Sequence, residues 1–137
     1  MSGRILQAHA GIGDTVEGEA LVAADNFSAR YDLDRIAGVF SRPSHKLYGR
    51  SYVGKVLVLN AAKGGVATAW MLNEMAARGM APLALVLNFA NPIMAQGAAF
   101  GGVPLIDRFA DGDVTALIRD GQRVRVEPAA GRVVLLD

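Results

Sequence analysis

The chain has 137 residues, of which 52% are hydrophobic and only 20% charged, and its formal net charge is +1. This length predicts a single domain spanning residues 1–137, and this composition excludes a disordered chain. Acidic and basic residues are mixed along the chain without a basic stripe or polybasic segment, so neither nucleic acid nor a membrane is an expected partner. The high apolar fraction leaves room for an exposed apolar surface that a partner chain would cover.

Cysteine is absent, and the two histidines, His9 and His45, lie far apart in the sequence. The chain therefore offers no thiolate ligand or cysteine nucleophile, and we expect it to bind no metal or cofactor by itself. Its first residues lack the apolar core of a signal peptide, and the apolar run at 80–89 is too short to span a bilayer. These features indicate a cytoplasmic protein.

Hydrophobic periodicity predicts an α/β fold. Strands are expected at residues 5–9, 17–24, 55–59, 83–87, 103–106, 123–127 and 133–136, and helices at residues 66–78 and 93–100. Residues 27–39 fit neither period well, residues 41–54 resemble a long polar loop, and residues 114–118 fit a short strand or a helical turn. A loop as long as that at 41–54 is more often functional than incidental.

The strands at 55–59 and 83–87 are apolar without alternation, so both of their faces should be buried. They flank the first helix and predict a central parallel β–α–β unit. In such sheets, ligands bind where the strands end. We therefore expect residues 63–65, 88–91 and 107–108, which follow three of the strands, to be neighbours in space.

Within the first predicted helix, Trp70, Met71 and Met75 recur at helical spacing, and we expect all three in the hydrophobic core. A role for Trp70 in stacking on a cofactor is the less expected alternative. Gly79 follows at a position where helices commonly end.

The turn Lys63-Gly64-Gly65, between a strand and a helix, is the best candidate site. Backbone N–H groups are free at the start of a helix, the helix dipole adds partial positive charge there, and Lys63 adds a full charge. Such a turn suits a carboxylate or a phosphate, although it matches neither a Walker loop nor a dinucleotide fingerprint. The alternative is a turn that only reverses the chain, with a solvated lysine.

Residues 45–58, with the sequence His-Lys-Leu-Tyr-Gly-Arg-Ser-Tyr-Val-Gly-Lys-Val-Leu-Val, resemble the signature His-Pro-x-x-Gly-x-Ser-x-x-Gly-Lys-Val-Leu-Val of the aconitase X swivel domain. As in that family, a glycine-rich turn, an Ala-Pro strand, a Gly-Ala segment and a short strand follow, at residues 63–65, 81–84, 97–99 and 103–106. The resemblance covers residues 18–108. It implies a swivelling β/β/α domain like the mobile domain of aconitases.

The resemblance also implies a role as the small subunit of a dehydratase, a hydro-lyase. Its large catalytic subunit would hold an iron or iron–sulfur centre on cysteines. Members of the group dehydrate small hydroxy acids, either cis-3-hydroxy-L-proline or mevalonate 5-phosphate. We expect the first of these substrates, because Lys63 is the one obvious cation and no cluster of arginines suits a phosphate together with a carboxylate. A phosphomevalonate dehydratase small subunit is the alternative.

One position departs from the family pattern. Many members carry a catalytic serine where this chain has Gly65. Thr68, one turn into the helix, is the nearest hydroxyl, and it either replaces that serine or bonds back to a helix carbonyl. The departure also motivates a different reading, in which the chain is a non-catalytic binding or regulatory domain that kept the fold. A self-sufficient small-molecule enzyme is disfavoured because metal ligands are missing.

Further candidates lie outside the turn. His45, in the polar loop, would be a general acid that helps hydroxide leave, or else a surface histidine. Ser28 and Arg30, with Asp32, would form a clamp on the substrate acid group, or else an ordinary surface ion pair. Asn91 would supply an amide contact at a strand end, or else form a turn before proline.

Overall fold

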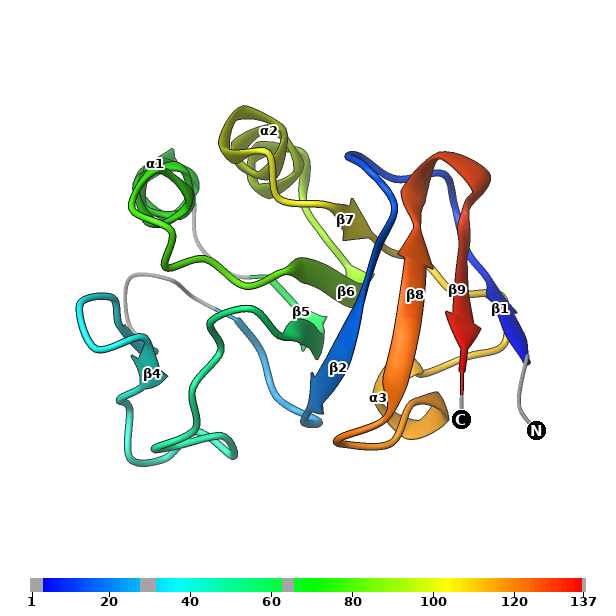
Figure 1. Ribbon diagram of the computed structural model, residues 1–137, viewed down its shortest axis with the longest axis horizontal. Helices are drawn as coiled ribbons and strands as arrows, with labels where there is room; N and C mark the ends of the chain where they lie inside the picture. Colours follow the sequence, from blue (N-terminus) through cyan, green and yellow to red (C-terminus); the bar gives the residue numbers. More distant parts are fainter. Residues whose placement is uncertain (1–3, 28–31, 63–65, 137) are drawn as a thin grey trace.

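The computed structural model describes residues 4–27, 32–62 and 66–136, with the backbone alone at 66–69 (Figure 1). Along the chain, the elements are β1 (Ile5–Gln7), β2 (Val16–Val22), β3 (Leu33–Asp34), β4 (Val39–Phe40), β5 (Val56–Ala61), α1 (Val66–Ala77), β6 (Ala84–Phe89), α2 (Pro92–Gly101), β7 (Leu105–Ile106), α3 (Val114–Leu117), β8 (Arg123–Glu127), the 3-10 turn η1 (Pro128–Ala130) and β9 (Arg132–Leu135). None of the helices in the described part of the chain has the length and hydropathy needed to cross a membrane.

The main sheet has the strand order β1-β9-β8-β2-β5-β6-β7. The strands β2, β5, β6 and β7 are mutually parallel, whereas β8 and β9 form a hairpin that joins β2 and β1 in antiparallel pairs. The expected parallel β–α–β unit is therefore present as β5-α1-β6. Its register places Leu57 beside Leu85, and Leu85 beside Leu105.

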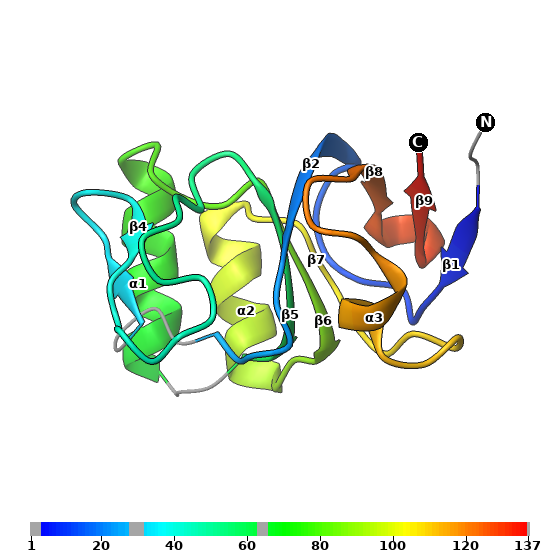
Figure 2. The same cartoon turned by 90° about the horizontal axis from the view of Figure 1, so that it is seen from below.

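The chain after β1 joins the two edges of this sheet. Ile12 and Leu105 exchange both backbone hydrogen bonds, each 2.8 Å long, and the N–H of Ala110 donates to the carbonyl of Gln7 at 2.8 Å. Because β1 pairs with β9 and its continuation pairs with β7, the sheet curls into a barrel-like half (Figure 2). This closure protects sheet edges that would otherwise be open to other chains.

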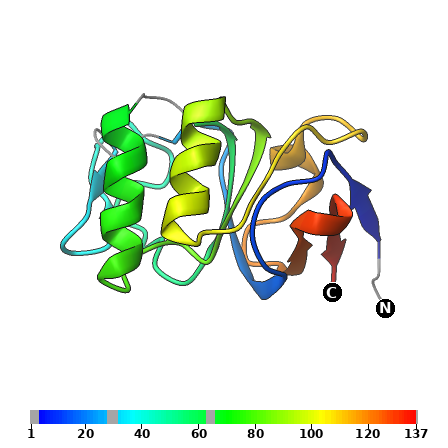
Figure 3. The same ribbon diagram turned by 90° about the horizontal axis from the view of Figure 1, so that it is seen from above.

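Two hydrophobic cores lie on opposite faces of the central strands. On β5, Leu57 and Leu59 point into the core beneath α1 and α2, whereas Val56 and Val58 point into the barrel interior. Helices α1 and α2 lie side by side on one face (Figure 3), and α3 packs at the opposite face near β5 and β6. Both faces of β5 are covered, as the uninterrupted apolar pattern predicts.

Small residues allow α1 and α2 to approach closely. A Cβ placed on Gly101 would lie 3.3 Å from the Cα of Asn73. Helix α2 begins with Asn91 as its N-cap and Pro92 in its first turn, and it ends at Gly102, which has a φ of 69°. The strong start and stop signals explain why this helix was recognisable from the sequence.

Most of the expected elements are present, and the ambiguous segments are resolved by packing. The segment 27–39 contains β3 and the first residue of β4, which pair as a short hairpin, and residues 114–117 form the helical turn α3 behind its N-cap Asp113. The expectation for Trp70 was wrong: Met75 is fully buried, but 67% of Trp70 is exposed. Helical spacing places Trp70 and Met75 on different faces of α1, and of these two side chains only Met75 belongs to the hydrophobic core.

A Gly11→Ala substitution tests the closure of the barrel. A Cβ on Gly11 would lie 2.1 Å from the carbonyl oxygen of Leu105, so the seam between residues 8–12 and β7 would have to shift. We expect a loss of about 2 kcal/mol in the free energy of unfolding, measured by urea denaturation. Gly54→Ala is the control, since nothing lies within 4 Å of its Cβ position and only its φ of 70° resists the change. An equal or smaller loss for Gly11→Ala would contradict the closure.

Candidate functional site

Two identical tetrapeptides end side by side at the carboxyl edge of the parallel strands. β5 contains Leu-Val-Leu-Asn at residues 57–60, and β6 contains the same letters at residues 85–88. Their matched register places Asn60 beside Asn88, whose side-chain N–H donates to the Oδ1 of Asn60 at 3.0 Å. Asn60 in turn donates to the Oδ1 of Asn26, after β2, at 3.1 Å. A row of side-chain amides thus crosses this edge from β2 to β6.

The same row fixes the start of α3. Asn88 donates to the carboxylate of Asp113 at 2.8 Å, and its own Oδ1 accepts the N–H of Val114 at 2.8 Å. Hydrogen bonds from Asn88 and then from Thr115 hold the pKa of the Asp113 carboxyl below its usual range. Asp113 is therefore an anion that caps α3 rather than a proton donor near neutral pH.

Arg108 stands at the end of β7 with an uncommon backbone. Its φ is 63°, the left-handed region that costs a residue other than glycine about 1 kcal/mol. Its N–H donates to the carbonyl of Asn88 at 3.0 Å, and its guanidinium lies 5.0 Å from the centre of the Phe89 ring. The segments after β6 and β7 are thus neighbours, as the sequence predicts, and a cation is held there.

Asp107 completes this corner. Its Oδ2 accepts the N–H of Ala90 at 2.9 Å and lies 3.6 Å from the Nε of Arg108. The loop after β6 is therefore tied to the loop after β7 by a carboxylate, and one side of the guanidinium is fixed.

Several of the predicted site residues lie outside the described residues: Ser28, Arg30, Lys63, Gly64 and Gly65. Thr68 lies in the first turn of α1, with its backbone alone described. Residues on either side of these gaps do belong to the edge described above. The N–H of Phe27 donates to the carbonyl of Ala61 at 2.8 Å, and the N–H of Ala62 donates to the carbonyl of Phe89 at 3.4 Å.

His45 is buried, which excludes the alternative of a surface histidine and leaves its role as a general acid a prediction. Its side chain has no exposed area and stacks on the ring of Phe40 at a centroid distance of 4.5 Å. Its Nδ1 accepts the N–H of Leu47 at 3.0 Å, so Nε2 carries the proton and donates to the carbonyl of Asn26 at 2.7 Å. Both ring nitrogens are engaged in holding the 41–54 loop against the segment after β2.

Two carboxylates accompany His45. Oδ2 of Asp25 lies 3.8 Å and Oδ2 of Asp32 lies 3.9 Å from its Nε2, and Arg42 donates from Nε to Asp32 at 2.5 Å. Burial raises the pKa of Asp25, but hydrogen bonds from the N–H groups of Asn26 and Lys46, with the positive charge of Arg42, outweigh it and leave that pKa lowered. Asp32 therefore belongs to the network that anchors the loop.

Asn91 caps α2. Its side chain accepts the N–H of Met94 at 2.8 Å, so the role of turn former that the sequence left open is present in the structure. An amide contact to substrate remains a prediction for this residue.

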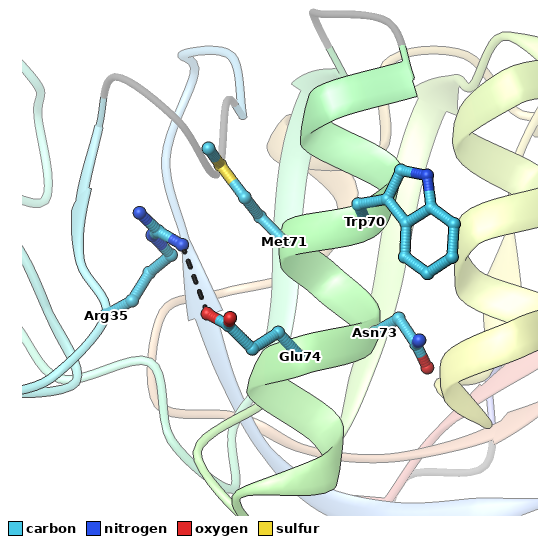
Figure 4. Close-up of a pocket in the computed structure, with 5 residues that line it drawn as sticks. All are labelled: Arg35, Trp70, Met71, Asn73 and Glu74. Atoms are coloured by element: carbon cyan, nitrogen blue, oxygen red, sulfur yellow. Dashed lines mark hydrogen bonds and ion pairs between the residues drawn. The ribbon is translucent and has the colours of Figure 1, made fainter.

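Large apolar side chains flank the seam between α1 and α2. Trp70 is 67% and Phe100 74% exposed, and Ile93, two turns before Phe100, is also exposed on α2. Figure 4 shows the Trp70 indole leaning from α1 toward α2. We call Trp70, Ile93 and Phe100 the α1–α2 apolar face. A surface of this kind commonly marks a contact with another protein.

An open depression of about 510 Å³ borders this face. Besides Trp70, its lining includes Met71 and Asn73, and the ion pair between Arg35 and Glu74, 3.4 Å long, closes the other side (Figure 4). Exposed ion pairs of this kind contribute little to stability. Among the described residues of its lining, only Arg35 and Glu74 are titratable, and they pair with each other, which distinguishes the depression from the polar edge of the sheet.

The described residues contain no group of three or more histidine or acidic side chains that could hold a metal ion. The full sequence contains no cysteine. An iron–sulfur centre therefore does not fit the ligands that this chain offers.

The model of the family described as "Aconitase X swivel domain" matches residues 5–135. A phosphomevalonate dehydratase small subunit from Methanothrix thermoacetophila is 36% identical over 96% of this chain and 95% of its own length. Its counterpart from Pyrococcus horikoshii is 34% identical over 92% of each chain. A chain in the crystal structure of the holo-form of Thermococcus kodakaraensis aconitase X superposes with a TM-score of 0.90 at 26% identity, covering 98% of this chain and all of that one.

Sequence reasoning placed residues 107–108 at this edge without giving Arg108 a role, and it missed the amide row. The repeated Leu-Val-Leu-Asn tetrapeptide was a usable signal, because equal strands in a parallel pair place equal residues side by side. The left-handed backbone conformation of Arg108 has no comparable signal in the sequence, because only Gly, Asn and Asp commonly adopt that conformation.

A pair of substitutions at His45 separates a positioning role from a catalytic one. His45→Ala removes the ring stack and both hydrogen bonds, and we expect it to lower the free energy of unfolding by about 3 kcal/mol. His45→Gln keeps a donor for the Asn26 carbonyl, and we expect it to recover part of that loss. His9→Ala, at an exposed position, is the control and should change stability by less than about 0.5 kcal/mol.

The free energy of unfolding of each variant is measured by denaturation of the full chain. The second measurement is the kcat of each variant in the assembled enzyme. A positioning role predicts that His45→Gln retains most of kcat. A folded His45→Gln variant with a hundredfold lower kcat would instead support a general acid, because glutamine cannot transfer a proton.

Proposed function

This chain belongs to the aconitase X swivel-domain family, and we propose that it is the small subunit of a dehydratase acting on mevalonate 5-phosphate. The observation that carries the proposal is similarity along almost the whole chain to phosphomevalonate dehydratase small subunits, at 36% and 34% identity. The relatives are small subunits of a hydro-lyase, and mevalonate 5-phosphate as the substrate of this chain's complex is our proposal.

The charge of the candidate edge supports the choice of substrate. The sequence favoured cis-3-hydroxy-L-proline because Lys63 was the one obvious cation. Arg108 adds a second cation at the same edge, over Phe89, which pairs with Ala61 at the end of β5. A substrate that carries both a carboxylate and a phosphate needs two such cations, so the reason for preferring hydroxyproline is removed.

The chemistry divides between two chains in this proposal. An iron or iron–sulfur centre in the large subunit would supply a Lewis acid for the leaving hydroxyl. The residues of this chain bind the substrate acid groups and exclude water when the small subunit closes. Lys63 and the amides of Gly64 and Gly65 receive the carboxylate. Thr68 is the proposed hydroxyl for proton transfer, in place of the serine that many family members carry at the position of Gly65.

Reconstitution tests this function. The tagged chain is co-expressed with the cysteine-containing large subunit from the same genome, and dehydration of mevalonate 5-phosphate and of cis-3-hydroxy-L-proline is measured. We expect a stable pair that dehydrates the phosphorylated substrate. Activity on hydroxyproline alone would overturn the substrate, and a pair without dehydratase activity would favour the non-catalytic binding domain.

Site variants accompany that experiment. We expect Lys63→Ala and Thr68→Ala each to lower kcat/KM by about tenfold or more, since each removes a contact to the reacting substrate. Lys55→Ala is the matched control, because Lys55 pairs with Glu19 at the opposite end of β5. Wild-type kcat/KM in both site variants would exclude the proposed assignment of the turn.

The α1–α2 apolar face is the proposed docking surface for the large subunit. Trp70 and Phe100 border the same seam, because Gly101, next to Phe100, contacts Asn73, which lies one turn after Trp70. Burying two large apolar side chains contributes several kcal/mol to association. The proposed function requires a large subunit as partner. Contact with that subunit would cover the aromatic side chains that this small chain leaves exposed.

Pull-down of the large subunit measures the role of that face. We expect Trp70→Ser and Phe100→Ser each to weaken the Kd of the pair by about tenfold or more while the isolated chain stays folded. Ile36→Ser is the control, because Ile36 is exposed in the turn between β3 and β4, outside this face. Unchanged affinity in both aromatic variants would place the docking surface elsewhere.

A further inference from the structure

We infer that Arg108, with Phe89 beneath it, forms the subsite for the phosphate group of the substrate. The inference rests on the proposed function and adds to it a residue and a chemical role. Within the described chain, Arg108 is the one residue other than glycine with a positive φ, at 63°. A residue held in a sparsely populated backbone conformation, at the edge of a sheet where ligands gather, is a candidate for function.

The surroundings of Arg108 orient the side chain and leave its end open. The backbone is fixed by the hydrogen bond from its N–H to Asn88, and Nε faces Asp107. The terminal amino groups form no hydrogen bond or ion pair with any other described residue, and 51% of the side chain is exposed. The aromatic ring of Phe89 supports the guanidinium from one side, which reduces the entropy lost when it binds a ligand.

The chemistry of a guanidinium suits a phosphate. Two parallel N–H donors match two phosphate oxygens, and the cation remains charged at all relevant pH values. Helix α2 begins three residues after Phe89, so its partially positive end lies at the same corner. Because the carboxylate is assigned to Lys63 and the glycine amides, Arg108 is the cation left for the other end of the substrate.

Kinetics of the assembled enzyme test this subsite. We expect Arg108→Ala to raise the KM for mevalonate 5-phosphate by about tenfold to a hundredfold, with a smaller change in kcat, because it removes charge-assisted hydrogen bonds to a group distant from the reaction. Inorganic phosphate should inhibit the wild type competitively and inhibit Arg108→Ala at least tenfold more weakly. Arg108→Lys should be intermediate, because it keeps the charge without the paired donors.

A glycine variant separates binding from stability. Glycine adopts a φ of 63° without strain, so Arg108→Gly should raise the Tm of the full chain by a few degrees while weakening phosphate inhibition as Arg108→Ala does. Arg78→Ala is the control, since Arg78 is an exposed arginine paired with Glu74 at the far end of α1. Its KM and its inhibition by phosphate should equal those of the wild type.

The outcomes distinguish this inference from the proposed function. If the wild-type pair dehydrates mevalonate 5-phosphate and Arg108→Ala keeps its KM and its inhibition by phosphate, the subsite is wrong and the function stands. A raised KM with unchanged phosphate inhibition would assign Arg108 to the carboxylate and also overturn the subsite. If the wild-type pair is inactive, thermal stabilisation of the pair by inorganic phosphate that Arg108→Ala abolishes supports the subsite, and its absence in the wild type overturns it.

Discussion

The parallel pairing of β5 with β6 is the constraint on which the rest of the molecule depends. Leu57, Val58 and Leu59 have no exposed area, and their partners Leu85, Val86 and Leu87 are equally buried. Each side chain of this size contributes about 1.5–3 kcal/mol when it is buried. Since successive residues alternate between the helix-covered core and the barrel interior, the pair belongs to both cores. A shift of register by one residue would exchange the two sets of side chains.

That register also determines the polar edge. It brings Asn60 beside Asn88, and Asn88 then positions both α3, through Asp113, and the loop after β7, through Arg108. An amide that satisfies several partners at once is costly to replace, because each partner would be left without a hydrogen bond. The edge is thus a rigid frame of amides from which one strained cation projects. Preorganisation of this kind lowers the entropic cost of binding an anion.

A second frame lies on the other side of the parallel edge, around His45. The ring is held between Phe40, Asn26 and Leu47, and the neighbouring carboxylates are held by Arg42 and backbone N–H groups. This network fastens the 41–54 loop, the part of the chain that carries much of the family signature, to the end of β2. The histidine of the signature therefore has a structural role in this chain: it anchors the loop beside the site.

The sequence by itself determined the elements and the family. Uninterrupted apolar runs identified β5 and β6, the Asn-Pro start and glycine stop identified α2, and the rule that parallel strands end at one edge predicted that residues 88–91 and 107–108 would meet. Tertiary structure alone decided the closure of the barrel by residues 8–12, the burial of His45, the exposure of Trp70 and the backbone of Arg108. Each of these features depends on contacts between residues far apart in the chain. Local propensity and hydrophobic periodicity do not predict such contacts, so they do not predict which surfaces are buried.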